Sequence, residues 1–371
     1  MKEVELAIVG GGPAGLSAAM VAAQAKAGVL LIDDGQRLGG QLVKQTHKFF
    51  GSKGQYASTR GIEIARILVK GLEGFSDLEV WLNSTAVGYY PDGILAVLQG
   101  ERLLRVKPAR LIVATGASEK MLAFANNDLP GVYGAGAVQT LMNVYGVLPG
   151  RRALMVGAGN IGLIVGYQLM QAGVKVEAVV EAMPGIGGYW VHAAKIRRMG
   201  VPILTSHTIL RAEGEEWVEG AIICPLAKGF KPIEAAQRRL EVDTICLAVG
   251  LSPLSELLWQ AGCKMEYISQ VGGYVALRRE DMETTVKGVY VAGDSAGVEE
   301  ASTAMVEGRM AGLAAALSLG CRVEDADGLK RDLREELEML RRGPVGEKIR
   351  EGIKRVLIGQ LEISKNPQPR R

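Results

Sequence analysis

The stretch VELAIVGGGPAG, residues 4–15, decides the fold class of this chain of 371 residues. Its first half predicts a short buried strand, its glycines predict a tight turn, and the Ala-rich stretch that begins at Pro13 predicts a helix. A second apolar strand, VLLI at residues 29–32, follows and ends in Asp33-Asp34. A strand, a glycine turn, a helix and a strand within about 30 residues form a βαβ unit, which predicts a parallel sheet with a right-handed crossover.

The same pattern returns further along the chain. Gly157–Gly162, GAGNIG, follows an apolar strand and precedes a helix, and the next apolar strand, VKVEAVV, ends at Glu181. Gly10 and Gly157 are 147 residues apart, and so are Asp34 and Glu181. One GxGxxG motif is weak evidence, but two in register, each after a strand and ahead of an acidic residue, predict two dinucleotide-binding units.

Composition excludes several other classes of protein. Glycine is abundant (49 residues) and aromatic residues make up only 5% of the chain, which fits tight strand-to-helix turns and disfavours an aromatic-rich β-sandwich. The net charge of +3 gives no case for nucleic acid as a partner. The four cysteines and three histidines lack the spacing of a metal site or a disulfide framework, so we expect no metal and a reducing, cytoplasmic compartment. No stretch reaches ~18 uninterrupted apolar residues, so no transmembrane helix is predicted.

The first glycine turn has the residue types that a pyrophosphate needs. Gly10 permits the tight turn, Gly12 lets the backbone approach the phosphates, and Gly15 allows close packing of the helix on the strand. The phosphate charge would then face the N–H groups at the helix amino terminus. Asp34 would accept hydrogen bonds from both ribose hydroxyls and repel a 2′-phosphate. The alternative is a glycine-rich turn without a ligand.

Three further motifs carry a resemblance to a known superfamily. They are GGQ at Gly39–Gln41, ATG at Ala114–Gly116 and VAGD at Val291–Asp294. Together with the two glycine motifs they make Val4–Leu319 similar to the pyridine nucleotide–disulfide oxidoreductase type of flavoprotein. The resemblance implies that the first unit binds FAD and that the second, inserted into the first domain, binds NAD(P)H.

The resemblance also implies the domain boundaries. We expect an α/β protein with two Rossmann-like, three-layer ββα domains and a helical C-terminal tail. The FAD-binding domain would comprise residues 1–120 and 247–325, with residues 121–246 as the inserted NAD(P)-binding-like domain. Residues 326–371 would form the tail. The amphipathic pattern of residues 329–361 suits either docking to a partner or packing back onto the chain's own domain.

Residues of the first unit receive roles from the same resemblance. Asp294 would bind a ribityl hydroxyl of FAD, and the helix that starts near Glu300 and Ala301 would direct its positive end at the flavin pyrimidine. Lys48 would lie beside the flavin or else be an ordinary solvated side chain. Ala86 would contact adenine through its backbone or serve only strand packing. The residues expected at FAD are Gly10, Gly12, Pro13, Ala14, Gly15, Asp34, Gly40, Gln41, Lys48, Ala86, Ala114, Thr115, Gly116, Gly293, Asp294, Glu300 and Ala301.

Fewer residues of the second unit receive a role. Glu181 favours NADH over NADPH, because a carboxylate placed for a 2′-hydroxyl repels a phosphate. Lys195, Arg197 and Arg198 would either admit that phosphate or form a solvated helix face. Ile164 stands where many NADH-using relatives carry glutamate, which leaves open a nucleotide that is held only structurally. The residues expected at this nucleotide are Gly157, Gly159, Asn160, Ile161, Glu181 and Gly250; no catalytic acid or base is identified.

One departure narrows the resemblance. Disulfide reductases of this superfamily need a cysteine pair beside the flavin, and the chain has none. It is therefore most similar to the alpha-type subunits of bacterial dehydrogenases that act on sarcosine, hydroxyproline, proline or opines. That group implies FAD, NAD or NADP, a second flavoprotein subunit that oxidises the amine or amino acid, and a small iron–sulfur subunit. The alternatives are a stand-alone NAD(P)H:acceptor flavin reductase and a non-catalytic nucleotide-binding scaffold subunit.

Overall fold

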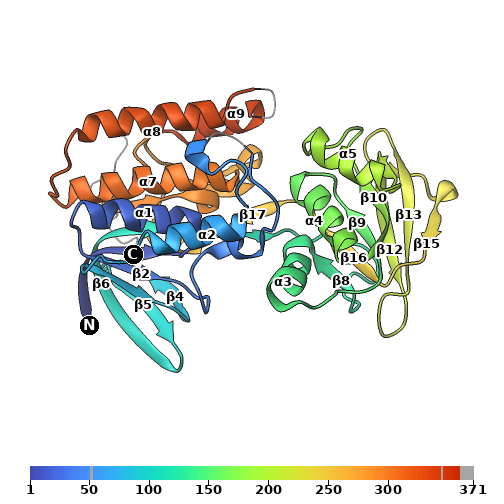
Figure 1. Cartoon of the computed structure of the whole chain (residues 1–371), viewed down its shortest axis with the longest axis horizontal. Helices are drawn as coiled ribbons and strands as arrows, with labels where there is room; N and C mark the ends of the chain where they lie inside the picture. Colours follow the sequence, from blue (N-terminus) through green and yellow to red (C-terminus); the bar gives the residue numbers. More distant parts are fainter. Residues whose placement is uncertain (51–52, 344–345, 360–371) are drawn as a thin grey trace, which may run out of the picture. The chain divides into compact units, whose positions relative to one another are not determined.

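The chain forms two compact units, one inserted in the other (Figure 1). Unit 1 consists of Met1–Ser118 and Ser252–Arg371, and unit 2 is Glu119–Leu251. The computed structural model describes residues 1–50, 53–343 and 346–359.

A parallel sheet forms the centre of unit 1. Its strands lie in the order β3–β2–β1–β6–β20, and each neighbouring pair is parallel. Leu6, Ala7 and Ile8 of β1 and all four residues of β2 are buried, as expected for parallel strands that are covered on both faces. The strand bounds are β1 (Lys2–Val9), β2 (Val29–Ile32), β3 (Leu78–Trp81), β6 (Arg102–Val113) and β20 (Val289–Val291).

The long strand β6 also belongs to a second, antiparallel layer. Its first half pairs with β5 (Leu95–Gln99), which pairs with β4 (Ser84–Tyr89). Val106 marks the change, because it pairs with Leu95 on one side and with Lys2 on the other. The parallel sheet, this meander and the helices confirm the predicted three-layer α/β class.

Two helices of unit 1 pack with their backbones almost in contact. A Cβ atom added at Gly308 of α7 (Ala301–Ser318) would lie 2.1 Å from the carbonyl oxygen of Ala14 in α1 (Pro13–Gln24). Only glycine allows this approach, which holds the first turn of α1 against α7.

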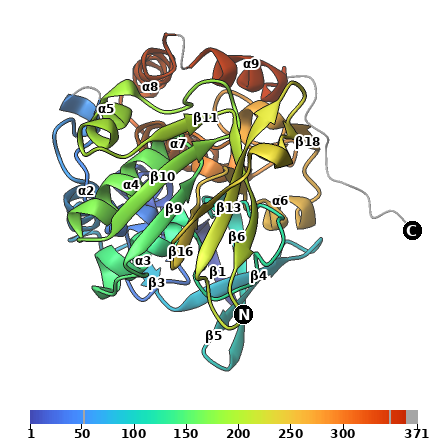
Figure 2. The same ribbon diagram turned by 90° about the vertical axis from the view of Figure 1, so that its right-hand side faces the viewer.

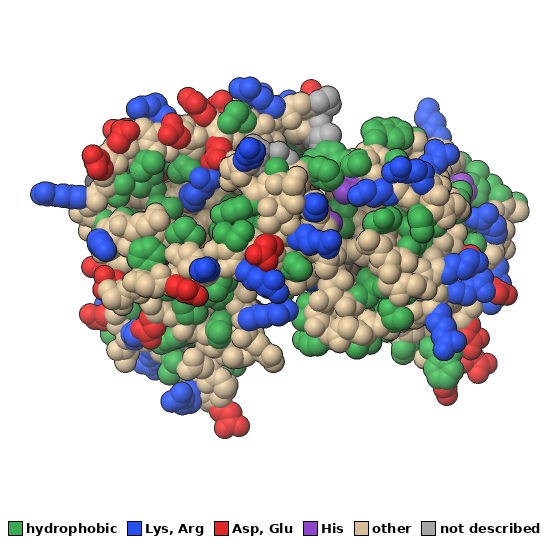
Figure 3. Space-filling model, viewed as in Figure 1, with side chains coloured by type: hydrophobic (Ala, Val, Ile, Leu, Met, Phe, Trp, Pro, Cys, Tyr) green, Lys and Arg blue, Asp and Glu red, His purple; other side chains and the backbone are tan. Residues whose placement is uncertain are grey.

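The predicted C-terminal tail packs back onto unit 1. α8 (Ala326–Leu340) lies on α7 (Figure 1), and its Leu333 and Leu337 are buried in the core of the unit. α9 (Glu347–Val356) buries Val356 completely in a smaller apolar cluster. The apolar face is therefore used internally, while the exposed face of α8 carries charges of both signs (Figure 3). Parts of the predicted tail, residues 344–345 and 360–371, lie outside the described residues.

Unit 2 repeats this plan around a second parallel sheet. Its strands lie in the order β11–β10–β9–β16–β8, most of which can be followed in Figure 2. An antiparallel layer joins β12 and β14 to β13, and β15 also pairs with β13. The bounds are β8 (Val132–Gly134), α3 (Ala135–Tyr145), β9 (Arg152–Val156), α4 (Asn160–Gln171), β10 (Lys175–Glu181), α5 (Trp190–Arg198), β11 (Ile203–Thr205), β12 (His207–Glu213), β13 (Gly220–Ala227), β14 (Lys231–Pro232), β15 (Arg238–Leu240) and β16 (Thr244–Leu247).

Short elements complete the two units. None of the helices in the described ranges has the length and apolar character needed to cross a bilayer. The remaining elements are η1 (Gly40–Lys44), η2 (Lys53–Gln55), α2 (Gly61–Lys70), β7 (Ala117–Glu119), η3 (Glu234–Ala236), β17 (Leu251–Pro253), α6 (Glu256–Gln260), β18 (Met265–Ile268), η4 (Ser269–Val271), β19 (Gly273–Ala276) and η5 (Gly293–Ser295).

Candidate functional site

The first glycine turn joins β1 to α1, as predicted. Gly10 has φ +108°, and a Cβ atom there would lie 2.2 Å from Ala114 O, so no larger residue fits. A Cβ atom on Gly15 would lie 1.7 Å from Gly10 O, which makes Gly15 the close-packing glycine of the turn. The nearest atom to a Cβ position on Gly12 is 3.8 Å away. This leaves room for a ligand at the amino terminus of α1, where the first N–H groups lack acceptors within the helix.

The acidic residue that contacts this turn is Asp33. Its Oδ2 atom accepts a hydrogen bond from Gly11 N–H at 2.5 Å, and its Oδ1 atom accepts one from Gly35 N–H at 2.9 Å. Asp34, the predicted residue, is exposed. Asp33 was missed by the sequence analysis, although it directly follows the last residue of β2, Ile32, and that position is the sequence signal for the acid.

A second pair of glycines lies on the same turn. Gly39 N–H donates to Gly11 O at 2.8 Å, and a Cβ atom on Gly40 would lie 2.7 Å from Cα of Gly12. Gln41 follows in η1 with an exposed side chain. The structure therefore brings the predicted residue Gly40 to the glycine turn, and the contact of Gln41 with FAD stays a prediction.

Two more predicted segments meet the turn at the carboxyl ends of β6 and β20. Ala114 follows β6 and touches Gly10, as described above, while the Thr115 hydroxyl donates to Leu254 O at 2.7 Å. Gly116 has φ +77°. A Cβ atom on Gly293, which lies just after β20, would be 2.8 Å from the Cβ atom of Ala14. Ala14 is the second residue of α1. Segments far apart in sequence thus converge on the first turn of α1.

Asp294 lies in the buried turn between β20 and α7. Burial raises the pKa of its carboxyl group to about 6; the Glu299 N–H, 3.4 Å from Oδ1, lowers it, and the Glu307 and Glu299 carboxylates raise it. α7 begins at Ala301, and Glu300 is the residue before it, so both lie at the helix start as predicted. A largely buried carboxyl group with a raised pKa therefore lies in the turn that leads to α7.

Two predicted residues lie in other elements of unit 1. Lys48 is exposed, and its backbone pairs with Arg60 in an isolated antiparallel bridge. Ala86 lies on β4 opposite Val97 of β5, next to an irregularity in the strand register. Their contacts with FAD stay predictions.

The second glycine turn has the geometry of the first. Gly157 has φ +105°, and a Cβ atom there would lie 2.3 Å from Ala248 O. A Cβ position on Gly159 has no atom of the described residues within 4 Å. Asn160 starts α4, and its Oδ1 atom accepts a hydrogen bond from Tyr189 N–H at 2.8 Å. Ile161 and Ile164 follow within α4.

The acid of the second unit corresponds to Asp33 and not to Asp34. Glu181 Oε2 accepts a hydrogen bond from Ala158 N–H at 2.8 Å, as Asp33 does from Gly11. Asp34 and Glu181 are therefore not at equivalent positions, although their spacing from the glycines is equal, and the role of either acid toward a ribose stays a prediction.

A glycine pair also covers the second turn, and the sequence analysis missed it. Gly187 N–H donates to Ala158 O at 3.1 Å, the same contact that Gly39 makes with Gly11. The signal is a repeated motif after each acid, LGGQ at residues 38–41 and IGGY at residues 186–189.

The remaining predicted residues of unit 2 occupy two places. Gly250 follows β16 with φ +118°, and its carbonyl oxygen accepts a hydrogen bond from Lys120 N–H at 3.0 Å. The Lys195 ammonium lies over the Tyr167 ring, 5.4 Å from its centre. Arg197 and Arg198 are exposed on α5, as a solvated helix face requires.

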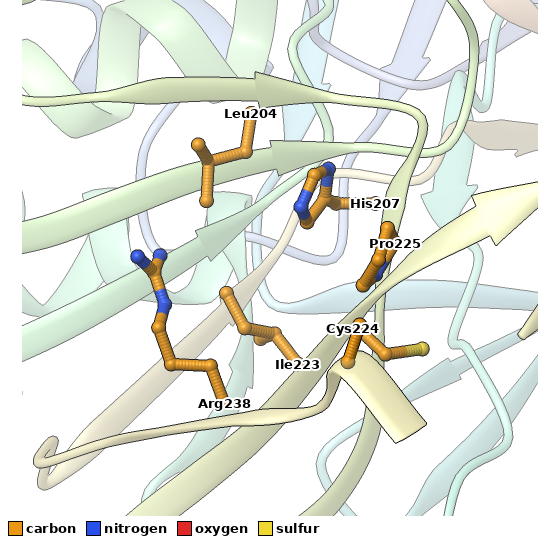
Figure 4. Close-up of a pocket in the computed structure, with 7 residues that line it drawn as sticks. Leu204, His207, Ile223, Cys224, Pro225 and Arg238 are labelled. Carbon is orange, nitrogen blue, oxygen red and sulfur yellow. The ribbon is translucent and has the colours of Figure 1, made fainter. Parts of the chain in front are cut away.

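Unit 2 also contains a small cavity of about 210 Å³ within its antiparallel layer (Figure 4). The Cys224 sulfur points away from the other labelled side chains, so the cavity does not present a thiol. None of the predicted site residues lines it. The lining residues are Leu204, His207, Ile223, Cys224, Pro225, Ala236 and Arg238.

Comparison with known proteins agrees with this geometry. A family model described as "Pyridine nucleotide-disulphide oxidoreductase" matches residues 4–308. The chain belongs to this family. It is a flavoprotein oxidoreductase with nucleotide-binding, Rossmann-like domains, and the predicted superfamily is confirmed.

Several curated relatives are subunits of larger enzymes. The alpha subunit of sarcosine oxidase from Rhizobium meliloti (strain 1021) is 27% identical over 88% of this chain, which spans only 32% of that protein. An opine oxidase subunit from the same strain is 27% identical over 86% of the chain and 72% of its own length. The HcnB subunit of hydrogen cyanide synthase from Pseudomonas protegens is 27% identical over 96% of the chain and 79% of its own length.

Solved structures have the same fold. L-Proline dehydrogenase from P. horikoshii matches with a TM-score of 0.68 and 25% identity over 90% of this chain and 59% of its own. Thioredoxin reductase from T. acidophilum matches with a TM-score of 0.70 and 20% identity over 86% of this chain and 99% of its own, which is a likeness of fold alone.

Proposed function

We propose that the chain binds FAD in unit 1 and is the FAD- and NAD-binding, alpha-type electron-transfer subunit of a multi-subunit amine or amino acid dehydrogenase. The observation that carries the proposal is the convergence of Ala114, Gly40 and Gly293 on the Gly10–Gly15 turn. Each of these residues approaches the turn more closely than a side chain would allow. Such a cradle of bare backbone suits a pyrophosphate that needs N–H donors.

The residues present fit FAD. The space at Gly12 and the first N–H groups of α1 would hold the pyrophosphate, Asp33 would accept from the ribose hydroxyls, and Asp294 would contact the ribityl chain. FAD, when bound, supplies hydride or electron transfer. The chain would orient the ring and place the amino terminus of α7 where negative charge is stabilised.

The thiols support electron transfer without a disulfide. All four cysteines are free, and burial raises the pKa of the Cys263 thiol to about 11. Burial also raises the pKa of Cys246. Thiols that stay protonated near neutral pH are poor nucleophiles, so thiol–disulfide exchange is not proposed.

The named relatives support a role within a larger complex. They are subunits of sarcosine oxidase, opine oxidase and hydrogen cyanide synthase. By this likeness we expect a second flavoprotein subunit that oxidises an amine or amino acid, and a small iron–sulfur subunit that relays electrons.

The test is the absorption of the purified chain. We expect a bound flavin that NADH does not bleach within seconds, but that is reduced when the second flavoprotein and an amine are added anaerobically. A chain that takes up no FAD under any expression condition would refute the proposal.

A pair of variants tests which acid holds the ribose. We expect Asp33→Asn to weaken FAD binding about tenfold or more, because a charge-assisted hydrogen bond is worth about 1.5–3 kcal/mol. Asp34→Asn is the matched control, and its affinity should stay within about twofold of wild type because Asp34 is exposed. The opposite ranking in equilibrium dialysis would restore Asp34 as the ligand.

A second candidate function is favoured by unit 2. Its glycine turn, its acid and its covering glycine pair all repeat those of unit 1. These features suit a stand-alone NAD(P)H:acceptor reductase, for which NADH alone would bleach the flavin rapidly.

A further inference from the structure

Four buried charged side chains surround the Gly293-Asp294 turn. The Arg278 and Glu307 side chains are 3% and 2% exposed. Those of Arg341 and Glu299 are 12% and 8% exposed. Charges removed from water this fully are stable only as a complete, hydrogen-bonded set.

Glu307 connects the cluster to the turn itself. Its Oε2 atom accepts a hydrogen bond from Gly293 N–H at 3.0 Å. Its Oε1 atom accepts one from Arg278 at 3.1 Å and one from Arg341 at 2.7 Å. The position of Gly293 against α1 therefore depends on a carboxylate that two arginines hold.

Glu299 connects the cluster to the other side of the turn. Arg341 makes a bidentate pair with it, Nε to Oε2 at 3.0 Å and Nη2 to Oε1 at 2.7 Å. The Glu299 N–H faces Asp294 Oδ1 at 3.4 Å. Arg341 thus holds carboxylates on both sides of Asp294 in the planar geometry that a guanidinium provides.

Both arginines are fixed by the C-terminal segment. Arg341 is the residue directly after α8, and Arg350 of α9 donates to its carbonyl oxygen. The end of α9 and the residues after it pair with the backbone of Arg278: Arg278 N–H donates to Val356 O at 3.1 Å, and Ile358 N–H donates to Arg278 O at 3.0 Å. The packing of α8 and α9 therefore sets where the two guanidinium groups lie.

α8 also holds a third segment of unit 1. Glu336 accepts hydrogen bonds from Gln55 of η2 and from Arg309 of α7. α8 thus contacts Gln55 and α7 through Glu336, and Arg341, directly after the helix, contacts the residues that hold the Gly293-Asp294 turn.

We propose that the α8–α9 segment is a structural part of the flavin site and that Arg341 is its positioning residue. It holds the Gly293-Asp294 turn and the start of α7 in the conformation that accepts the ribityl chain and the flavin ring. The proposal rests on the proposed function, because it presumes FAD in unit 1. It assigns the tail a role in cofactor binding and not in docking.

The first test compares Arg341→Gln with Arg342→Gln, an exposed neighbour on the same turn. In the full chain we expect Arg341→Gln to raise the dissociation constant of FAD about tenfold or more and to shift the flavin absorption bands, because two carboxylates lose a buried partner. Arg342→Gln should match wild type in both measurements. Arg341→Lys keeps the charge and should recover part of the affinity, which a purely steric role for the side chain would not allow.

The second test is hydrogen exchange of the FAD-free chain, which needs no activity. In Arg341→Gln the amides of Gly293 and Glu299 should exchange at least about tenfold faster than in Arg342→Gln. Equal exchange in the two variants, or wild-type FAD affinity in Arg341→Gln, would overturn this inference alone.

Failure of the proposed function gives a different result. A wild-type chain that takes up no FAD would overturn the proposed function, and with it the role of Arg341 toward a cofactor. If Arg341→Gln does not fold, the double variant Arg341→Gln/Glu299→Gln removes both members of the pair, and we expect it to fold and to bind FAD about tenfold or more weakly than wild type. A folded double variant with wild-type FAD affinity, or a double variant that also fails to fold, would count against the pair.

Discussion

At one edge of each parallel sheet, the edge strand is followed along the chain by a helix. In unit 1 the edge strand β20 is followed by α7, and in unit 2 the edge strand β8 is followed by α3. In unit 2 the Glu119 carboxylate fills the amino terminus of that helix, since it accepts hydrogen bonds from Gly136 N–H at 2.6 Å and Ala137 N–H at 3.2 Å. In unit 1 Asp294 lies in the turn before α7, and its Oδ1 atom accepts a hydrogen bond from Glu299 N–H at 3.4 Å. The comparison teaches that in unit 2 a carboxylate of the chain itself already occupies the positive end of this helix, whereas our proposal assigns that end in unit 1 to the negative charge of a ligand.

The two units differ also in what supports that helix. In unit 1 the start of α7 is held by buried carboxylates and arginines that come from four separate segments. In unit 2 a single carboxylate, that of Glu119 at the end of β7, contacts the start of α3. A site that binds a large cofactor needs a support that does not occupy the ligand's place, and under our proposal Glu307 and Arg341 would provide it.

The largest effect is expected at the glycines that both units share. Gly10→Ala would place Cβ 2.2 Å from Ala114 O, and Gly157→Ala would place it 2.3 Å from Ala248 O. Each should lower the free energy of unfolding by about 3 kcal/mol or more, because a backbone clash adds to strain at positive φ. Only Gly10→Ala should abolish FAD binding, as measured by urea unfolding and flavin content.

Gly74→Ala separates the two causes. Gly74 has φ +91° but no atom of the described residues within 4 Å of its Cβ position, so the cost there should be only about 1 kcal/mol. A Gly157→Ala chain that loses FAD as completely as Gly10→Ala would break the assignment of separate roles to the two units.

A smaller, pH-dependent effect is expected at Asp294 in the FAD-free chain. Because burial raises its pKa from 3.8 to about 6, the native state binds this proton more tightly than the unfolded chain. The resulting stabilisation is fully present below about pH 4 and is lost as the pH rises through about 6. Wild type should therefore lose about 2–3 kcal/mol relative to Asp294→Asn between these limits.

The Glu299 and Glu307 carboxylates, which raise the pKa of Asp294, and the Arg278 and Arg341 side chains that pair with them are unchanged in that variant. Asp332→Asn, an exposed acid on α8, is the control and should follow the wild-type pH dependence in urea unfolding. Parallel curves for wild type and Asp294→Asn would show that Asp294 is not the group whose pKa is raised.

The sequence predicted the glycine turns because strand, turn and helix are local and their spacing is fixed by the fold. It misplaced the first acid for a physical reason. β10 contains an irregularity between Val176 and Ala178 that adds a residue relative to β2, so its acid comes one position later. Equal spacing from the glycines therefore selected Asp34, whereas the structure places Asp33 at the turn.

The buried charges could not be predicted from local pattern. Arg278, Glu299, Glu307 and Arg341 are distant in sequence, and a charged residue after an amphipathic helix is ordinarily solvated. Arg341 lies beside Glu299 because α8 packs on α7, and this packing is a tertiary contact that the local sequence pattern does not specify. Leucine periodicity predicted the helix itself and left its two uses, docking or internal packing, equally open.

The smallest effect is expected at Glu119, where the two units differ most directly. Glu119→Gln replaces a carboxylate that accepts from two N–H groups with an amide that offers one acceptor, so we expect a loss of about 1 kcal/mol in the stability of unit 2. The Gly136 and Ala137 amides should exchange faster, with FAD content unchanged. Glu216→Gln, an exposed acid of the same unit, should do neither. If Glu119→Gln instead tightened NADH binding severalfold, the amino terminus of α3 would be a ligand site that Glu119 blocks. The two helices would then differ only in what occupies their amino termini, and not in whether they can bind a ligand.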